Sequence, residues 1–166
     1  GVAGRGSVQI DLVDGAGMTD EVEIARPAST LDLPRLTSNR YRLYPVVDQV
    51  ADKVCATMAD YDGRPSSREK DLVDIVVFAV TQDIDGTALS LAIDTELHRR
   101  KMEPFERFVV PSAWGTGYVK QSRPVPHCVD YPTVELAAEL ASRLVDPTLS
   151  SEAQGKLWSG DLLEWR

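Results

Sequence analysis

Several residue types and patterns are scarce in this chain, and each scarcity removes a class of protein. The 166 residues include only two cysteines, Cys55 and Cys128, and two histidines. Two cysteines in apolar surroundings do not build a disulfide framework, and with two histidines they do not match zinc-site spacing. No apolar run approaches the roughly 20 residues of a membrane span, and the N-terminus lacks the apolar core of a signal peptide. We therefore expect a cytoplasmic protein that does not enter a membrane.

Positive charge is also in short supply. The chain has 26 acidic residues against 18 lysines and arginines, which gives a formal net charge of −8. Broad, non-specific binding of nucleic acid needs a positive surface, so that class is disfavoured. A nucleic-acid substrate stays compatible with the sequence, because basic residues gather locally at Arg64, Arg68 and Lys70 and again at 99–101. The alternative for both patches is a solvated helix end.

The hydrophobic pattern predicts one α+β domain. Alternation over 8–13 predicts a strand, and 21–24 and 41–44 are candidates for two more. Apolar spacing of the helical kind predicts helices over these ranges: 45–60, 66–80, 86–101, 133–145 and 151–158. The second helix is apolar around most of its circumference, so we expect it to be central and buried.

Helix-end signals set most of these boundaries. Ser66 followed by Glu69 is typical of a capping box, and Asp85 is a candidate cap for the third helix. Pro147 is expected to stop the helix that begins near 133. The segment 103–131 is rich in proline and aromatic residues, so we expect it to be irregular.

Two carboxylates stand out on the predicted central helix. Asp71 and Asp74 are three residues apart and therefore share one side of it, where apolar residues would be usual. A buried acid needs a partner, a metal or a chemical role. Both aspartates can form structural ion pairs with Lys53, Arg68 or Lys70. Alternatively, they can bind a metal, act as a general base, or orient a lysine toward a phosphate.

Two further residues carry weaker signals. Lys53 falls at the border of the apolar stripe of the first helix, where a lysine ordinarily extends its ammonium group to water. Asp11 lies on the predicted strand 8–13, and a rigid carboxylate there is compatible with a divalent metal. Most such aspartates are simply solvated, so spacing alone does not choose between the two interpretations.

Taken together, two blocks of sequence resemble the AbiEii/Men-type nucleotidyltransferase toxin family. The similarity is strongest in 44–56 and 67–75, and 8–12 matches more loosely. Pro104, Pro111, Trp114 and Tyr118 also fall where such proteins often carry them. The resemblance implies a DNA-polymerase-β-like nucleotidyltransferase sheet followed by helices. We accordingly predict a remnant of that sheet in 1–44 and a helical region continuous with it in 45–166.

The same resemblance implies a function. Members of the family are the toxin half of a toxin–antitoxin system, and Men-type members transfer a nucleotide from an NTP to the 3′ acceptor end of tRNA, which blocks aminoacylation. The expected cofactor is Mg²⁺, and the expected partners are an NTP, tRNA and a cognate antitoxin protein. We expect a monomer.

The resemblance also assigns roles to individual residues. Lys53 matches the family lysine that contacts the nucleotide's phosphates, and Asp71, ahead of Asp74, matches the downstream acid. Asp11 matches a strand carboxylate that holds metal. The predicted nucleotide- and phosphate-binding residues are Lys53, Arg64, Ser67 and Arg68.

One motif of the family is not matched. Its Gly-Ser turn precedes an Asp-x-Asp metal-binding pair, whereas here Gly6-Ser7 is followed by Asp11 and Asp14 at a different spacing. We therefore expect the principal metal-binding segment to be absent from this chain. Two alternatives stay open: an inactive module that binds antitoxin or tRNA, and a metal-dependent nuclease that uses the same acids.

Overall fold

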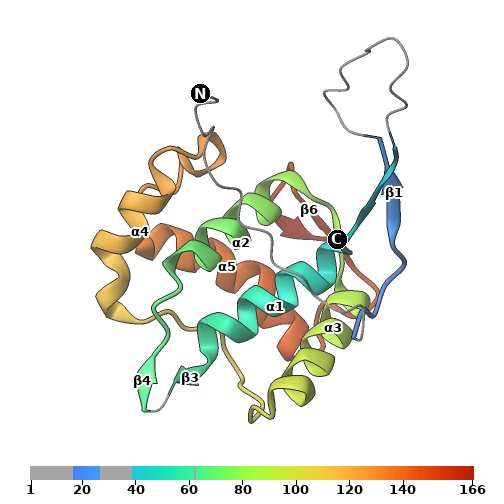
Figure 1. The fold of residues 1–166 in the computed structure, drawn as a ribbon, viewed down its shortest axis with the longest axis horizontal. Helices are drawn as coiled ribbons and strands as arrows, with labels where there is room; N and C mark the ends of the chain where they lie inside the picture. Colours follow the sequence, from blue (N-terminus) through green and yellow to red (C-terminus); the bar gives the residue numbers. More distant parts are fainter. Residues whose placement is uncertain (1–16, 27–38, 62) are drawn as a thin grey trace, which may run out of the picture.

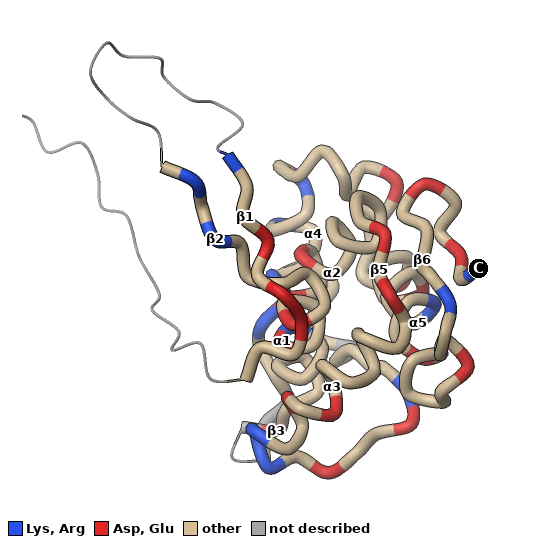
Figure 2. Tube along the Cα trace, turned by 90° about the vertical axis from the view of Figure 1, so that its right-hand side faces the viewer, with Lys and Arg blue, Asp and Glu red and all other residues tan. Residues whose placement is uncertain are grey.

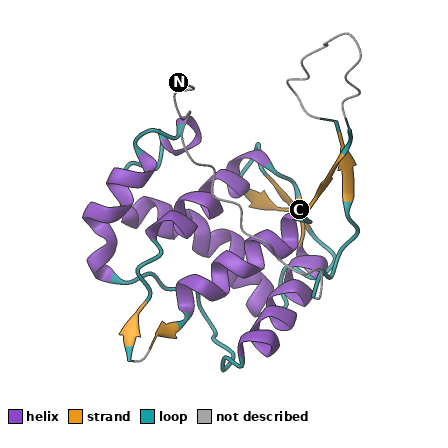
Figure 3. Ribbon diagram, in the orientation of Figure 1, coloured by secondary structure: helices purple, strands orange, loops and turns teal. Residues whose placement is uncertain are grey.

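The computed structural model describes residues 17–26, 39–61 and 63–166, and within them five α-helices and three small antiparallel sheets form the fold (Figures 1 and 3). The helices are α1 (Val46–Met58), α2 (Glu69–Thr81), α3 (Gly86–Arg100), α4 (Gly115–Ser122) and α5 (Val134–Leu149), with short 3-10 turns η1 (Ser112–Trp114) and η2 (Pro126–Cys128). The strands are β1 (Glu23–Ala25), β2 (Tyr41–Leu43), β3 (Asp60–Tyr61), β4 (Arg64–Pro65), β5 (Ile84–Asp85), β6 (Leu157–Ser159) and β7 (Glu164–Trp165). This mixture confirms the predicted α+β class.

Helix α2 occupies the centre of the helical body, as its apolar circumference predicts. It packs against α1, α4 and α5, and α1 packs in turn along α3. The side chains of Leu72, Ile75 and Val76 on α2 have no exposed surface. A helix that is apolar nearly all round is stable only when neighbours cover several of its faces, which is the arrangement found here.

The strands lie at the margins of this body. Strand β1 pairs with β2, Glu23 opposite Leu43, and the resulting hairpin projects away from the helices in Figure 1. The predicted strand 8–13 lies outside the described residues. Most of 1–44 does as well, so the division of the chain at residue 44 stays a prediction.

A second sheet, ordered β5-β6-β7, corrects the prediction of a final helix. Residues 151–155 form turns and Leu157–Ser159 forms β6, so the predicted helix over 151–158 is wrong. The reason is tertiary. Trp158 is fully buried and donates its indole N–H to the carbonyl oxygen of Ala79 at 2.8 Å, and its ring meets that of Trp165 edge to face at 5.6 Å. In β6 both Trp158 and Ser159 are buried while Leu157 is exposed, so tertiary packing and not a local pattern sets this segment.

The caps were predicted with mixed success. Asp85 accepts a hydrogen bond from the backbone N–H of Ala88 at 2.8 Å and begins α3, as predicted. The capping box is wrong, because α2 begins at Glu69 with Arg68 at the cap position and no side-chain cap bond. Ser66 is buried two residues earlier, where its carbonyl oxygen accepts the indole N–H of Trp114 at 2.8 Å. Because this hydrogen bond holds the backbone of Ser66 against Trp114, Ser66 does not cap α2.

Two more predictions are corrected farther along. Pro147 does not stop α5, which continues to Leu149. A proline leaves the carbonyl four residues earlier without its helical N–H, and that carbonyl, on Arg143, accepts the indole N–H of Trp165 at 3.1 Å. The segment 103–131 is not wholly irregular, since it contains α4. Burial of Tyr118, whose hydroxyl donates to the carbonyl oxygen of Tyr131 at 2.8 Å, stabilises this short helix.

Candidate functional site

The candidate site lies where α1 crosses the beginning of α2. Lys53 stands in the middle of α1, and Asp71 and Asp74 stand in the first two turns of α2. The apolar stripes of the two helices pack together, so residues at the border of each stripe meet at the rim of the contact. Sequence spacing placed each residue on its helix, and the packing of the helices brings them together.

Five charged side chains form what we call the Lys53 cluster: Lys53, Arg68, Lys70, Asp71 and Asp74. The ammonium nitrogen of Lys53 lies 2.9 Å from Asp74 Oδ2 and 3.5 Å from Asp71 Oδ1. Arg68 Nε lies 3.0 Å from Asp71 Oδ2, and Lys70 Nζ lies 2.8 Å from Asp74 Oδ2. Lys53 is thus the one member that joins the two helices through both carboxylates.

Burial differs sharply across the cluster. The side chain of Asp71 is 7% exposed and that of Asp74 is 24% exposed, while Arg68 is about half exposed. This confirms the prediction that Asp71 is the more deeply set acid. The ion-pair alternative is also realised, because each aspartate has two cationic neighbours.

The pKa shifts show how the cluster is balanced. Burial raises the pKa of the Asp71 carboxyl, and the nearby charges of Lys53 and Arg68 oppose this rise without cancelling it. For Lys53, burial favours the neutral amine, but the hydrogen bond and charge of Asp74 outweigh burial and raise the pKa of the ammonium group. Lys53 therefore stays cationic at neutral pH.

These residues do not fit a divalent metal. Among the described residues no group of three or more histidine, cysteine, aspartate or glutamate side chains is arranged to hold an ion. In the Lys53 cluster, three cations already face two carboxylates, which leaves an excess of positive charge. Such a set repels Mg²⁺ and favours a phosphate.

The other predicted site residues are only partly placed. Ser67 and Arg68 are exposed and lie directly before α2, beside Asp71. Arg64 lies in β4, and its side chain is outside the described part of the structure. Asp11, the predicted metal ligand, is also outside the described residues.

Sequence reasoning missed a second set of charges, the Glu96 cluster, formed by Asp52, Glu96, Arg99 and Arg100. Arg100 donates to Asp52 at 2.6 Å across the α1–α3 contact. Both arginines donate to Glu96, with Arg99 Nε at 2.7 Å from Glu96 Oε2. The three- and four-residue spacing from Glu96 to the arginines was a visible signal. The contact with Asp52 was not, because it depends on how α3 packs.

A second missed residue lies at the start of α1. Asp48 is buried, and its carboxylate accepts the backbone N–H of Thr19 at 3.0 Å and the Thr19 hydroxyl at 2.8 Å. This contact fixes the segment before β1 against the first turn of α1.

The Lys53 cluster sits in the stretch that resembles the toxin family, and a family model tests that resemblance. The model for the nucleotidyl transferase AbiEii toxin of a type IV toxin–antitoxin system matches residues 2–153. The chain belongs to the AbiEii family. Nucleotide transfer and a toxin–antitoxin context follow from this membership. No curated protein and no solved structure matches the chain.

Membership in the AbiEii family bears on the remaining expectations to different degrees. Nucleotidyltransferases of this kind typically use a divalent metal, and the family implies a nucleotide substrate and an antitoxin partner. Within the described residues no helix has both the length and the apolarity to span a membrane. The family does not assign catalytic residues in this chain, so the roles of Lys53, Asp71 and Asp74 stay predictions.

Proposed function

We propose that this AbiEii-family protein transfers a nucleoside monophosphate from an NTP to the 3′ acceptor end of tRNA, with Lys53 contacting the nucleotide's phosphates. The observation that carries the proposal is the position of Lys53 between Asp71 and Asp74. Two carboxylates hold its ammonium group at the rim of the α1–α2 contact, and the cluster keeps an excess of positive charge. A preorganised cation of this kind stabilises negative charge that develops during phosphoryl transfer.

The chemical step is a substitution at phosphorus. The 3′ hydroxyl oxygen of the acceptor forms a bond to the α-phosphorus, the bond from that phosphorus to the bridging oxygen breaks, and pyrophosphate leaves. The hydroxyl proton passes to a base. Asp71 suits this role because burial raises its pKa, although it serves equally to hold Lys53 in place.

The remaining assignments complete the proposal. Arg68 pairs with Asp71 at the start of α2, and the exposed Ser67 precedes it in the chain, so a cation and a hydroxyl are available to a phosphate there. Arg64 is assigned to the same task. We propose Mg²⁺ as the divalent metal and Asp11 as one of its ligands, since the described residues do not supply a metal site.

A transfer assay tests this function. The purified protein is incubated with radiolabelled NTPs, magnesium and total tRNA, and the products are resolved by length on a gel. Labelled, lengthened tRNA is the expected result. Shortened tRNA would point to a nuclease, unchanged tRNA that co-purifies with the protein would point to a binding module, and either result would overturn the proposal.

A matched pair of variants links the activity to the site. Lys53→Ala removes the proposed phosphate contact, and Lys120→Ala removes an exposed lysine of α4 that forms none of the cluster's ion pairs. Transfer should fall in the first variant and persist in the second.

A further inference from the structure

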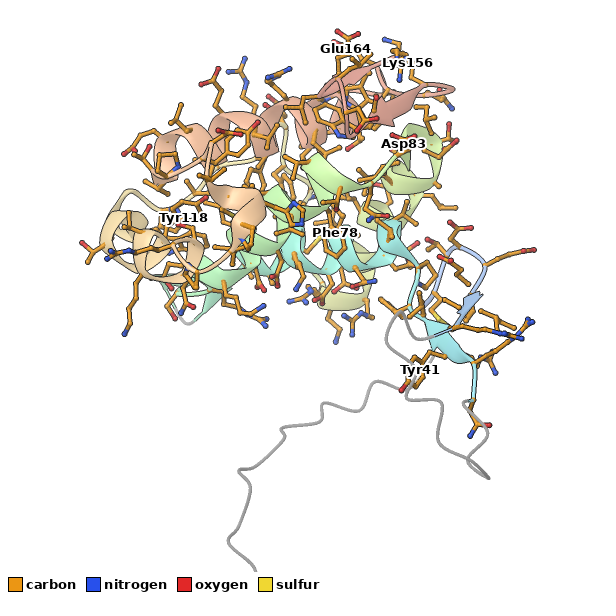
Figure 4. All side chains as sticks on the ribbon, turned by 90° about the horizontal axis from the view of Figure 1, so that it is seen from above. Tyr41, Phe78, Asp83, Tyr118, Lys156 and Glu164 are labelled. Atoms are coloured by element: carbon orange, nitrogen blue, oxygen red, sulfur yellow. The ribbon has the colours of Figure 1, made fainter. Side chains whose placement is uncertain are left out.

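A groove of about 740 Å³ among the described residues lies away from the Lys53 cluster. It runs between the β1–β2 hairpin, the start of α1, and the end of α2 with β5 and β6. Figure 4 shows Phe78 and Asp83 on the helical body and Tyr41 on the hairpin that stands beside it. The groove is open to solvent, so a ligand reaches it without a change of fold.

Large apolar side chains line this groove while remaining exposed. Leu43 is 42% exposed, Tyr44 is 40% exposed and Leu157 is 45% exposed; the first two are neighbours in the chain, and Leu157 comes from β6. Tyr41, two residues from Leu43 on β2 and therefore on the same face, extends the exposed apolar surface along the hairpin. Apolar side chains gathered in a concave surface indicate an interaction site, whereas single exposed ones do not.

The rim of the groove has a strong charge of one sign. Five carboxylates line it against a single cation, Arg42; they belong to Asp20, Glu21, Glu23, Asp83 and Asp85. Figure 2 shows acidic segments beside β1 and along β5. The ion pairs found among the described residues all belong to the Lys53 and Glu96 clusters, so the charge of this rim is not compensated there.

Hydrogen bonds hold the segments that carry the carboxylates of the rim in place. Asp48, buried in the first turn of α1, accepts both the backbone N–H and the hydroxyl of Thr19. This contact fixes Asp20 and Glu21 next to the mouth of the groove. On the opposite wall, Asp83 accepts the backbone N–H of Gly160 at 3.0 Å. A surface that is built before the ligand arrives loses less entropy on binding.

We propose that this groove binds a protein segment that combines lysine or arginine with apolar side chains. The carboxylate rim selects positive charge, and the exposed leucines and tyrosine bury the apolar residues. RNA is disfavoured because its phosphates would meet five carboxylates. The inference does not depend on the transferase activity, so an inactive enzyme would leave it standing.

The test uses a fluorescent twelve-residue peptide of alternating lysine and leucine, with binding followed by anisotropy. The variant Glu21→Gln/Glu23→Gln/Asp83→Asn removes three charges from the rim. The control, Glu152→Gln/Asp161→Gln/Glu164→Gln, removes three exposed charges from the C-terminal turns and β7. Affinity should fall about tenfold, or about 1.4 kcal/mol, in the rim variant and much less in the control.

Two further measurements separate this groove from general attraction to an acidic protein. Leu157→Ala changes no charge and should still weaken peptide binding about threefold, since it shortens an apolar contact. Bound peptide should also slow amide hydrogen exchange at 20–24 and 82–85.

Several outcomes would overturn the proposal. One is an equal loss of affinity in the rim and control variants. Another is binding of a single-stranded RNA of the same length at least as tightly as the peptide. A third is self-association of the protein, seen by sedimentation, that the rim variant abolishes, because the groove would then bind a second copy. Unfolding by urea checks that each variant is folded.

Discussion

Two neighbouring residues of α1, Asp52 and Lys53, belong to two charge clusters, and the clusters differ in their balance of positive and negative side chains. Lys53 faces α2, where three cations meet two carboxylates. Asp52 faces α3, where two arginines meet two carboxylates. Both clusters join α1 to its neighbour. Only the first leaves charge unbalanced.

The pKa shifts separate the clusters further. Burial acts against the charged form of Glu96, but hydrogen bonds from Arg99 and Arg100 outweigh it and lower the pKa of that carboxyl. For Asp71 burial prevails and the pKa is raised. A charge that its partners fully satisfy stabilises the fold. A buried charge that they do not fully satisfy is one that natural proteins keep mainly at functional sites. From this difference we predict a structural role for the Glu96 cluster and a chemical role for the Lys53 cluster.

The largest effect is expected on activity when Lys53 is removed. Lys53→Ala should lower the rate of nucleotide transfer on the order of 100-fold, the usual scale for loss of one preorganised electrostatic contact. Initial rates with labelled NTP measure this, with Lys120→Ala as the control. A decrease below about threefold would make the Lys53 cluster a structural link like the other one.

The largest effect on stability should come from Glu96→Ala. The change leaves Arg100, whose side chain is 21% exposed between α1 and α3, with only Asp52, and should lower the free energy of unfolding by about 3 kcal/mol. Urea unfolding measures it. Glu139→Ala on the exposed side of α5 should change the same quantity by less than about 0.5 kcal/mol. If Glu96→Ala and Glu139→Ala lowered the free energy of unfolding equally, the structural role of the Glu96 cluster would be refuted.

Asp71→Asn should affect activity more than stability, which is the opposite of what we expect for Glu96→Ala. Transfer should fall at least about tenfold, because the amide neither accepts a proton nor holds Lys53 by charge. The free energy of unfolding should change by less than about 1 kcal/mol, because the raised pKa shows that ionised Asp71 is already disfavoured by burial. Parallel rate and urea measurements on this variant decide the point. A stability loss as large as that of Glu96→Ala would refute the distinction drawn between the clusters.

The two acids should also affect acid stability with opposite signs, by less than Glu96→Ala does at neutral pH. The lowered pKa of Glu96 contributes stability above its ordinary value of 4.5, and this is lost as pH falls toward the folded-state pKa. The raised pKa of Asp71 has the opposite effect, since stability falls as pH rises from 3.8 to the folded-state pKa. Between about pH 6 and about pH 3, urea unfolding should therefore show a smaller loss of stability in Glu96→Gln than in the unaltered protein, and a larger loss in Asp71→Asn. The same sign in both variants would contradict these assignments.

The smallest effect belongs to Lys70. Its side chain is 68% exposed and its pair with Asp74 lies within one helix, so solvent screens the interaction. Lys70→Ala should change the free energy of unfolding by less than about 0.5 kcal/mol and transfer by less than about threefold. A larger loss of transfer would extend the phosphate site to this lysine.

Sequence patterns were most informative where one helix supplied the whole signal. The apolar circumference of α2, the cap at Asp85 and the deeper setting of Asp71 are all local properties, and all three predictions were confirmed. Three of the predictions that failed concern tryptophan. Trp114, Trp158 and Trp165 each donate an indole N–H to a backbone carbonyl distant in sequence, and these contacts account for the missed start of α2, the missed strand β6 and the continuation of α5.

The sequence by itself determined the α+β class, the family and the helix faces that carry Lys53 and Asp71, because helical periodicity fixes which side chains share a face. The tertiary structure alone decided which charges meet. It set Asp52 against Arg100 and Lys53 between two aspartates, because contacts between helices depend on packing that no local pattern encodes. It also formed the acidic groove, which gathers carboxylates from 20–23 and 83–85.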